Sequence, residues 1–285
     1  MRTAKGKSQE ICENPETKGQ KKGQMQRIKM GINSGSGHQM LSALLNMGEA
    51  LLASGAEIYR AEDTLSRMGH AYGAVSMNVF VITSSIVITM ELPGGETLTQ
   101  TRRIRTANTN DFSRLDKINE LSREFCREPF SVEELQRRLR QIMREPVSQK
   151  ELLAGSVLAA AAFAVFFGGN VRDGLAAAGG GLLIWALQAY VAPICMNDSV
   201  YTFIASFVMS LLVCAAGQIF PGLHVDQVMI GDIMLLIPGI MMTNAIRDFL
   251  LGDTISGALR LSQALLQAGI LALGVISALG IMRWM

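Results

Sequence analysis

Hydrophobic and polar positions divide the chain into two parts of different character. Between residues 38 and 148, apolar residues recur at the spacings of amphipathic helices and strands. After Lys150 they run almost without interruption over stretches of about 20 residues, the length that a helix needs to cross a bilayer. We therefore predict a polytopic α-helical membrane protein with five transmembrane helices, preceded by a cytoplasmic α+β domain.

The helices of the first part are predicted from leucine spacing and capping signals. Leucines three and four residues apart predict a helix from His38 onward, and a Ser54–Glu57 capping box predicts the start of a second helix. Two more helices are predicted at 112–127 and 132–145. The last begins with a capping box of Ser131 and Glu134.

A small antiparallel sheet is predicted between these helix pairs. β-branched and aromatic runs at 77–90, followed by a Pro93-Gly94-Gly95 turn and a third run at 97–105, favour strands. The resulting α+β domain covers residues 38–148. Residues 1–37 are rich in Lys, Gln, Gly and Ser and are predicted to be a disordered basic tail, not a cleaved signal peptide.

The second part, residues 149–285, contains five apolar stretches that are predicted to span the membrane. Short connections separate them, and small residues crowd several of them, which suits close helix packing in lipid. The predicted spans are 151–168, 173–191, 200–220, 228–246 and 260–282.

Basic residues indicate how these spans are oriented. Arg137, Arg138, Arg140, Arg144 and Lys150 lead into the first span, and such clusters stay on the cytoplasmic side. The α+β domain is therefore expected in the cytoplasm, and the protein in the inner (plasma) membrane as a multi-pass protein.

The fourth span holds the polar groups that form our candidate site for substrate binding or transport. A Pro-Gly pair interrupts an apolar helix there, and broken helices of this kind often line solute sites at membrane depth. The candidate residues are Asp232, Pro238, Gly239, Thr243, Asn244, Arg247 and Asp248. An alternative remains open: a plain kink, with Asp232 at the outer interface and Arg247 and Asp248 as a solvated pair at the inner one.

A second polar group lies in the first external loop. Asn170, Arg172 and Asp173 fall between the first two predicted spans. They are candidates for a gate, and the alternative is a simple polar turn.

Composition and charge narrow the functional class. Only 18% of residues are charged, against about a quarter in soluble domains, which argues against a disordered or nucleic-acid-binding protein. The formal net charge of +2 conceals an asymmetry, because 22 of the 26 Lys and Arg residues precede residue 151. The four cysteines are far apart and suggest neither a disulfide framework nor a metal site. We expect no cofactor and no metal, and the absence of a phosphate-binding loop argues against ATP-driven transport.

Several motifs resemble those of one transporter family. They are Gly55-Ala56-Glu57-Ile58-Tyr59-Arg60-Ala61-Glu62-Asp63-Thr64, Phe80-Val81-Ile82-Thr83, Phe167-Gly168-Gly169-Asn170 with Asp173, Pro238-Gly239 with Thr243-Asn244-Ala245-Ile246-Arg247-Asp248, Gly252-Asp253, Ser256-Gly257 and Arg260. Over residues 38–285 the chain resembles the threonine/serine exporter (ThrE-like) family, and in its layout the YjjP-type half-subunits.

This resemblance implies a cytoplasmic domain, a five-helix membrane domain, and export of threonine, serine or dicarboxylates such as succinate. Full-length members contain two five-helix halves, so the resemblance also implies a partner: a second small membrane subunit of the YjjB type. A unit with an odd number of spans pairs with its partner in inverted orientation, which places the solute site between the halves. An oligomer in the lipid bilayer is therefore expected.

We hypothesise that Thr243 and Asn244 hydrogen-bond the solute and that Arg247 attracts its carboxylate. Asp232 would carry a coupling proton if it is buried. The main rival is a membrane-anchored sensor or regulatory subunit whose soluble domain binds a ligand or a protein. An enzyme using Glu57, Glu62 and Asp63 is a weaker rival, because no matched acid and base accompany them, and we assign no catalytic residues.

Overall fold

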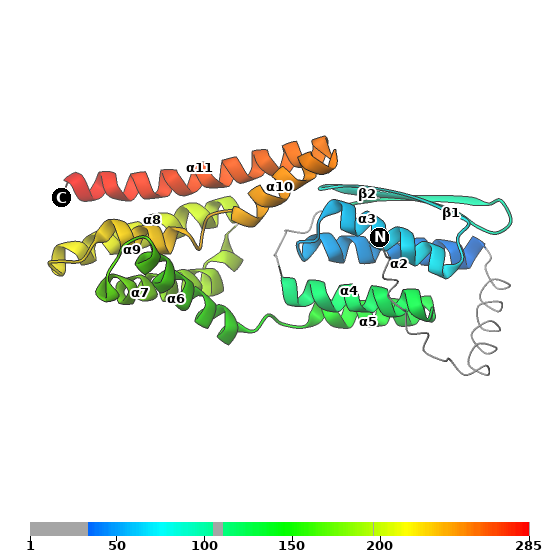
Figure 1. Ribbon diagram of the computed structural model, residues 1–285, viewed down its shortest axis with the longest axis horizontal. Coiled ribbons are helices and arrows are strands. Elements are labelled where there is room, and N and C mark those ends of the chain that lie inside the picture. The colour runs from blue at the N-terminus through cyan, green and yellow to red at the C-terminus, as the bar shows by residue number, and fades with distance from the viewer. Residues whose placement is uncertain (1–33, 105–110, 196, 285) are drawn as a thin grey trace, which may run out of the picture. The chain divides into compact units, whose positions relative to one another are not determined.

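The N-terminal unit is arranged in three layers, with a pair of helices in the middle. The computed structural model describes residues 34–104, 111–195 and 197–284, and the chain divides into the units Met1–Glu145 and Pro146–Met285. In the first unit a sheet covers one side of the central helix pair and a second helix pair covers the other (Figure 1). The helices are α2 (Ser34–Ala53) and α3 (Ile58–Tyr72) in the middle, and α4 (Phe112–Arg127) and α5 (Val132–Arg144) outside.

The sheet has three antiparallel strands in the order of the chain. They are β1 (Ser76–Ile82), β2 (Ser85–Glu91) and β3 (Thr97–Arg103). On β2, Ile86, Ile88 and Met90 are fully buried while the alternate residues are partly exposed, so one face of the sheet packs on α2 and α3. The three strands predicted from the β-branched runs are confirmed.

Helix α2 is buried on more than one side because it lies between the sheet and the outer helices. Leu41, Leu44 and Leu45, which the spacing placed on one apolar stripe, are fully buried, and so are Met40 and Met47. The helix begins at Ser34, so residues 34–37, predicted as the end of the tail, form its first turn instead. The remainder of the predicted tail lies outside the described residues.

The predicted Ser54–Glu57 capping box is wrong. Gly55 adopts a left-handed conformation (φ 95°) and closes α2 through two backbone bonds, from Ala56 N to Leu51 O at 3.0 Å and from Gly55 N to Leu52 O at 3.1 Å. Ser54 therefore belongs to the end of α2 and is fully buried. Glu57 precedes α3 but makes no side-chain capping bond.

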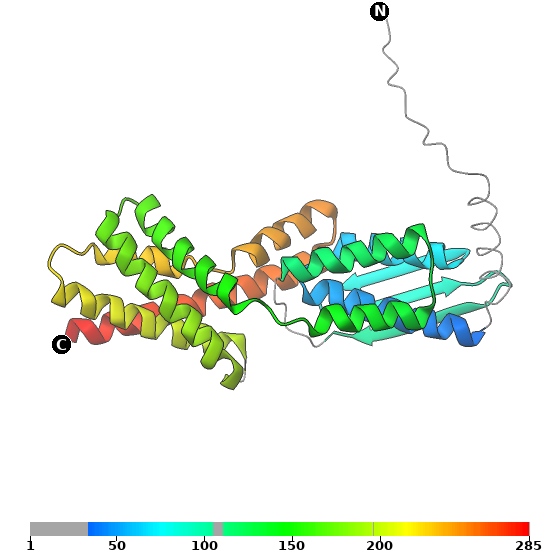
Figure 2. The ribbon, with the colours of Figure 1, turned by 90° about the horizontal axis from the view of Figure 1, so that it is seen from below.

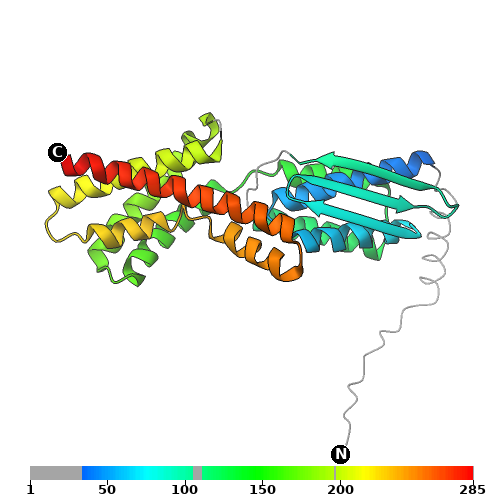
Figure 3. The ribbon, with the colours of Figure 1, turned by 90° about the horizontal axis from the view of Figure 1, so that it is seen from above.

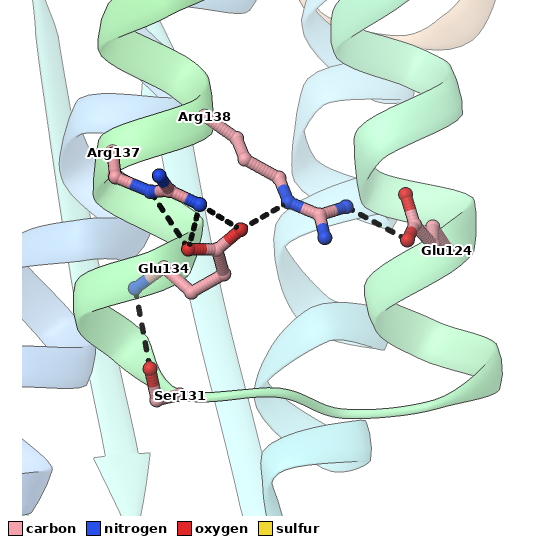
Figure 4. A network of polar contacts seen from close by, with 5 residues as sticks. All are labelled: Glu124, Ser131, Glu134, Arg137 and Arg138. Carbon is pink, nitrogen blue, oxygen red and sulfur yellow. Dashed lines mark hydrogen bonds and ion pairs between the residues drawn. The ribbon is translucent and has the colours of Figure 1, made fainter.

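A network of charged residues joins α5 to α4 (Figure 4). The Ser131 hydroxyl accepts a bond from Glu134 N at 3.3 Å, as predicted, but the Glu134 carboxylate turns to two arginines. Arg137 and Arg138 both donate to it, and Arg138 also donates to Glu124 of α4 at 2.7 Å. Because Arg138 bonds carboxylates on both helices, it fixes α5 against α4.

This network predicts a small dependence of stability on pH. Hydrogen bonds from Arg138 and then Arg137 lower the pKa of Glu134 below its ordinary value of about 4.3. The network therefore stabilises the fold at pH values above this ordinary pKa. Its contribution is lost as the pH falls through the lowered pKa of Glu134 in the folded state. We expect Glu134→Gln to reduce the fall in thermal unfolding midpoint between pH 6 and pH 3, measured by circular dichroism of the detergent-solubilised chain.

The control for this experiment is Glu120→Gln, which removes an exposed carboxylate of α4 outside the network. It should leave the pH dependence as in the unmodified chain. The effect of Glu134→Gln will be modest, because solvent screens ion pairs at the surface. A pH dependence identical in both variants and the unmodified chain would refute a role for the network.

The second unit consists of helices, four of which are long and apolar enough to cross a membrane within the ranges that the structure describes. These four candidate spans contain most of the predicted spans 151–168, 173–191, 200–220 and 260–282. The helices of the unit are α6 (Gln149–Phe166), α7 (Val171–Tyr190), the short η1 (Ala192–Ile194), α8 (Asp198–Ile219), α9 (Val225–Ile233), α10 (Gly239–Leu251) and α11 (Thr254–Trp284).

The predicted span 228–246 is not one helix. The structure divides it into α9 and α10, which are 9 and 13 residues long, so neither spans a membrane as a straight helix. Pro238 directly precedes α10 and lacks the N–H needed to continue a helix through this point. A count of five spans therefore depends on whether α9 and α10 cross the membrane together.

The helices of the second unit pack as two groups, which meet where α8 contacts α7 and α9. Helices α6, α7 and α9 contact one another, α11 lies beside α8, and α10 turns back against α11. Figures 2 and 3 show α11 from opposite sides, beginning at its hairpin with α10 and running along the unit to its C-terminal end. Large apolar side chains such as Leu175 (71% exposed) and Leu250 (82% exposed) lie on the outside, as expected where lipid replaces water.

Candidate functional site

Asp232 is a buried acidic residue in the helical unit. It lies on α9, its exposed fraction is 0%, and neither carboxylate oxygen has a hydrogen-bond partner among the described residues. The cluster formed by the neighbouring helices is apolar and includes Ala177, Ile184 and Val228. An isolated carboxyl group in such surroundings is costly, so its retention points to a function and not to stability.

Two glycines allow Asp232 to reach this position. A Cβ atom at Gly180 of α7 would coincide with the Asp232 carboxyl group, so only glycine leaves room for it there. A Cβ at Gly231 would lie 2.7 Å from Ala160 O and 2.9 Å from Ala164 Cβ of α6. Close packing of α9 on α6 and α7 therefore depends on the absence of side chains at these two positions.

The chain between α9 and α10 is a tight turn. Leu235 N donates to Asp232 O at 3.1 Å, and Leu236 N donates to Ile233 O at 2.8 Å. Pro238 then precedes α10, whose first residue is Gly239. The carbonyl end of one short helix and the amide end of the next thus lie close together in the chain, as in the broken helices of membrane transporters.

The other predicted residues of the fourth span lie on α10. Thr243 is exposed, and its hydroxyl donates to Gly239 O at 2.9 Å within the same helix. Asn244 is half-buried and Arg247 is exposed. Within the described residues, no hydrogen bond joins them to the Asp232 carboxyl group, so the predicted residues are distributed along a broken helix and do not gather in one pocket.

Asp248 lies away from solvent, whereas the kink alternative placed it in a solvated pair with Arg247. It is buried, and its Oδ2 lies 3.5 Å from Nε of Arg260 on α11. The two side chains are 2% and 5% exposed, so the ion pair lies between α10 and α11. Analysis of the sequence did not assign Arg260 to the site. The signal was available, since Arg260 is one of only four basic residues after position 150.

The predicted gate residues form a cap between two helices. The Asn170 side chain accepts bonds from Arg172 N and Asp173 N, and Asp173 Oδ2 accepts one from Asn170 N at 2.7 Å. The fully buried Asp173 also accepts bonds from the backbone N and ring Nδ1 of His224, at 2.9 and 2.8 Å. His224, which the sequence analysis did not single out, thus ties the start of α9 to the start of α7. Arg172 is exposed.

The carboxylates proposed for an enzyme have structural partners. Glu62 accepts a bond from Val81 N at 2.8 Å, which attaches α3 to β1, and Asp63 pairs with Arg67 at 2.7 Å. In the described ranges, no group of three or more His, Cys, Asp and Glu side chains is arranged to hold a metal ion.

Comparison of the sequence with known proteins identifies a matching protein family. The family model ThrE, described as "Putative threonine/serine exporter", matches residues 42–282. A protein of Schizosaccharomyces pombe, described as "Uncharacterized protein C16A10.01", is 26% identical over 190 residues, which are 64% of this chain. The aligned part is only 23% of that longer protein. No solved structure matches.

Proposed function

Because the chain belongs to the ThrE family, whose members are transporters, and forms a multi-pass membrane protein, we propose that it is one half of a secondary exporter. Its substrates are small amino acids such as threonine and serine, or dicarboxylates such as succinate. The membrane is the inner (plasma) membrane. The single observation that carries the proposal is the buried Asp232 beside a broken helix.

Asp232 is suited to bind the coupling proton. A charged carboxylate without partners is costly in an apolar interior, whereas a protonated carboxyl group is much less so. Proton binding and release at Asp232 therefore change how readily this region admits water and substrate. In this way the proton gradient drives export, and no nucleotide-binding site is needed.

The break between α9 and α10 supplies the polar groups that contact the substrate. At the start of α10, backbone N–H groups carry partial positive charge and suit a substrate carboxylate. Thr243 and Asn244 follow within two turns of this end and supply hydroxyl and amide groups. The exposed Arg247 lies one further turn along and attracts anionic substrates from the cytoplasm.

The proposed orientation follows from the basic residues before α6. They hold the first unit in the cytoplasm, and α9 with α10 then acts as one discontinuous span, the fourth of five. An odd number of spans calls for an inverted second half, which a separate subunit of the YjjB type would provide. The substrate site is then completed at the interface of the two halves.

This proposal is tested by efflux from cells that lack their own exporters. Labelled serine, threonine and succinate are followed in cells that express this chain, a second half of the YjjB type, or both. We expect export only when both are present. Absence of export in every combination, with both proteins inserted in the membrane, would reject the exporter and favour a membrane-anchored sensor.

The substrate contact is tested in the same cells with Asn244→Ala. This change removes an amide that hydrogen-bonds the substrate and leaves the backbone of α10 intact, so export should fall by about tenfold, the equivalent of one good hydrogen bond. The matched control is Gln263→Ala, which removes an exposed amide from α11, a helix that is not part of the break. Unchanged export by Asn244→Ala at equal abundance would remove Asn244 from the site.

A further inference from the structure

A hollow in the N-terminal unit lies between α2 and α5. Its volume is about 470 Å³, within the range of about 300–1,000 Å³ that small-molecule sites occupy. Its lining includes the apolar residues Ala50, Leu139 and Met143. The hollow lies entirely among residues of the first unit and shares no residue with the broken helix of the second.

Polar groups line the hollow from both helices. Helix α2 supplies Asn46 and Glu49, and α5 supplies Arg140 and Arg144. The two arginines are one helical turn apart, so their Cβ atoms are about 6 Å apart on one face. The two guanidinium groups can bind the two charged ends of a small ligand. The apolar side chains beside them can contact its carbon chain.

The net charge of the lining is positive after the ion pair between Glu49 and Arg102 is taken into account. Glu49 lies 3.5 Å from Nη1 of Arg102 on β3, and the same nitrogen donates to Oδ1 of Asn46. Arg102 therefore balances the one acidic group of the lining. The charges of Arg140 and Arg144 then exceed the negative charge around the hollow, so it favours an anion.

The other two arginines of α5 differ from Arg140 in their partners. Arg137 and Arg138 bind the carboxylate of Glu134, and Arg138 also binds Glu124 (Figure 4). Arg140 donates only its Nε to a carbonyl, Gln136 O, at 3.2 Å, which leaves its positive charge in place. Arginine binds carboxylates in planar, two-bond geometry, so a pair of arginines suits a ligand with two carboxylates.

We propose that the hollow between α2 and α5 is a binding site for a short dicarboxylate. Arg140 and Arg144 each bind one carboxylate, and the carbon chain of the ligand lies over Leu139 and Ala50. The site binds its ligand independently of export. Its place at the last turn of α5, directly before the segment that leads into α6, suits a regulatory site.

The test is isothermal titration calorimetry of the full chain in detergent micelles. The probes are succinate, its monocarboxylate counterpart butyrate, serine and inorganic phosphate. We expect succinate to bind at least about tenfold more tightly than butyrate, because one charged contact is worth a factor of about ten or more. Binding should weaken as salt is raised, because the site is partly open to solvent.

Variants distinguish this site from the transport site. Arg140→Gln with Arg144→Gln should weaken succinate binding by about tenfold or more, whereas Arg137→Gln, on the same helix, should leave it unchanged. Gln263→Ala, an exposed residue of the membrane unit outside the proposed export site, should also leave it unchanged. Binding would then stand even if no export were found in cells.

Four results would overturn the proposal. These are the absence of saturable succinate binding, unchanged binding in the double variant, equal binding of butyrate, and phosphate binding as tight as that of succinate. Loss of succinate binding in Asn244→Ala, with the double variant unaffected, would place the ligand in the membrane unit and reject the hollow.

Discussion

Replacing Asp232 by Asn is expected to abolish proton-driven export while the protein remains inserted in the membrane. Asparagine has nearly the same size and shape, so it fits beside Gly180, but it cannot bind and release a proton. Export driven by a pH gradient should therefore fall to the level of cells without the chain. Exchange of labelled for unlabelled substrate, which needs no net proton movement, should continue. Both are measured in the co-expression cells at equal membrane abundance.

The matched control is Asp226→Asn, on the same helix but exposed. It removes an equal charge from α9 and should leave proton-driven export within about twofold, as expected for a surface change. Full export by Asp232→Asn over the whole pH range would separate Asp232 from coupling. In that case its burial would need a purely structural explanation.

Replacing Arg260 by Met is expected to destabilise the second unit by about 3–5 kcal/mol. The guanidinium and the Asp248 carboxylate lie at 3.5 Å and are both almost completely buried. Removing one partner takes this ion pair away from a charge that stays buried. The free energy of unfolding is measured by denaturant titration in mixed micelles, together with membrane abundance in cells.

A double variant shows whether the expected loss of stability comes from an uncompensated charge or from lost packing. Arg260→Met combined with Asp248→Leu removes both charges and should recover most of the loss, because an apolar pair of similar volume is often as stable as a buried ion pair. Arg247→Gln is the control, an exposed neighbour whose removal should cost less than about 0.5 kcal/mol. A double variant as unstable as Arg260→Met alone would show that the loss comes from packing, not from an uncompensated charge.

The elements of the first unit could be predicted from local sequence because period and turn chemistry agree there. The β-branched residues around Ile86 and Ile88 predicted a strand, and the structure has β2 there, with Ile86, Ile88 and Met90 on its buried face. The capping box at Ser54 failed because a glycine in the left-handed conformation closed the preceding helix first. Residues 54–57 are compatible with a capping box at the start of α3 and with a glycine that ends α2. Only the backbone conformation at Gly55 distinguishes the two.

Asp232 was identifiable from the sequence, but its environment was not. A carboxylate within an apolar stretch is conspicuous in any hydropathy pattern. Its burial, however, depends on Gly180, which is 52 positions away and whose role appears only when α9 packs on α7. The same holds for Asp173 with His224, because hydrogen bonds between distant helices leave no periodic signal along the chain.

The contact between Gly180 and Asp232 also has a consequence for sequence variation. A Cβ at position 180 and a carboxyl group at position 232 would occupy the same space. Position 180 is therefore constrained by position 232: an alanine at 180 requires a smaller side chain at 232, or a shift of α9 away from α7. A designed relative that keeps the acid at 232 in this packing must therefore also keep the glycine at 180.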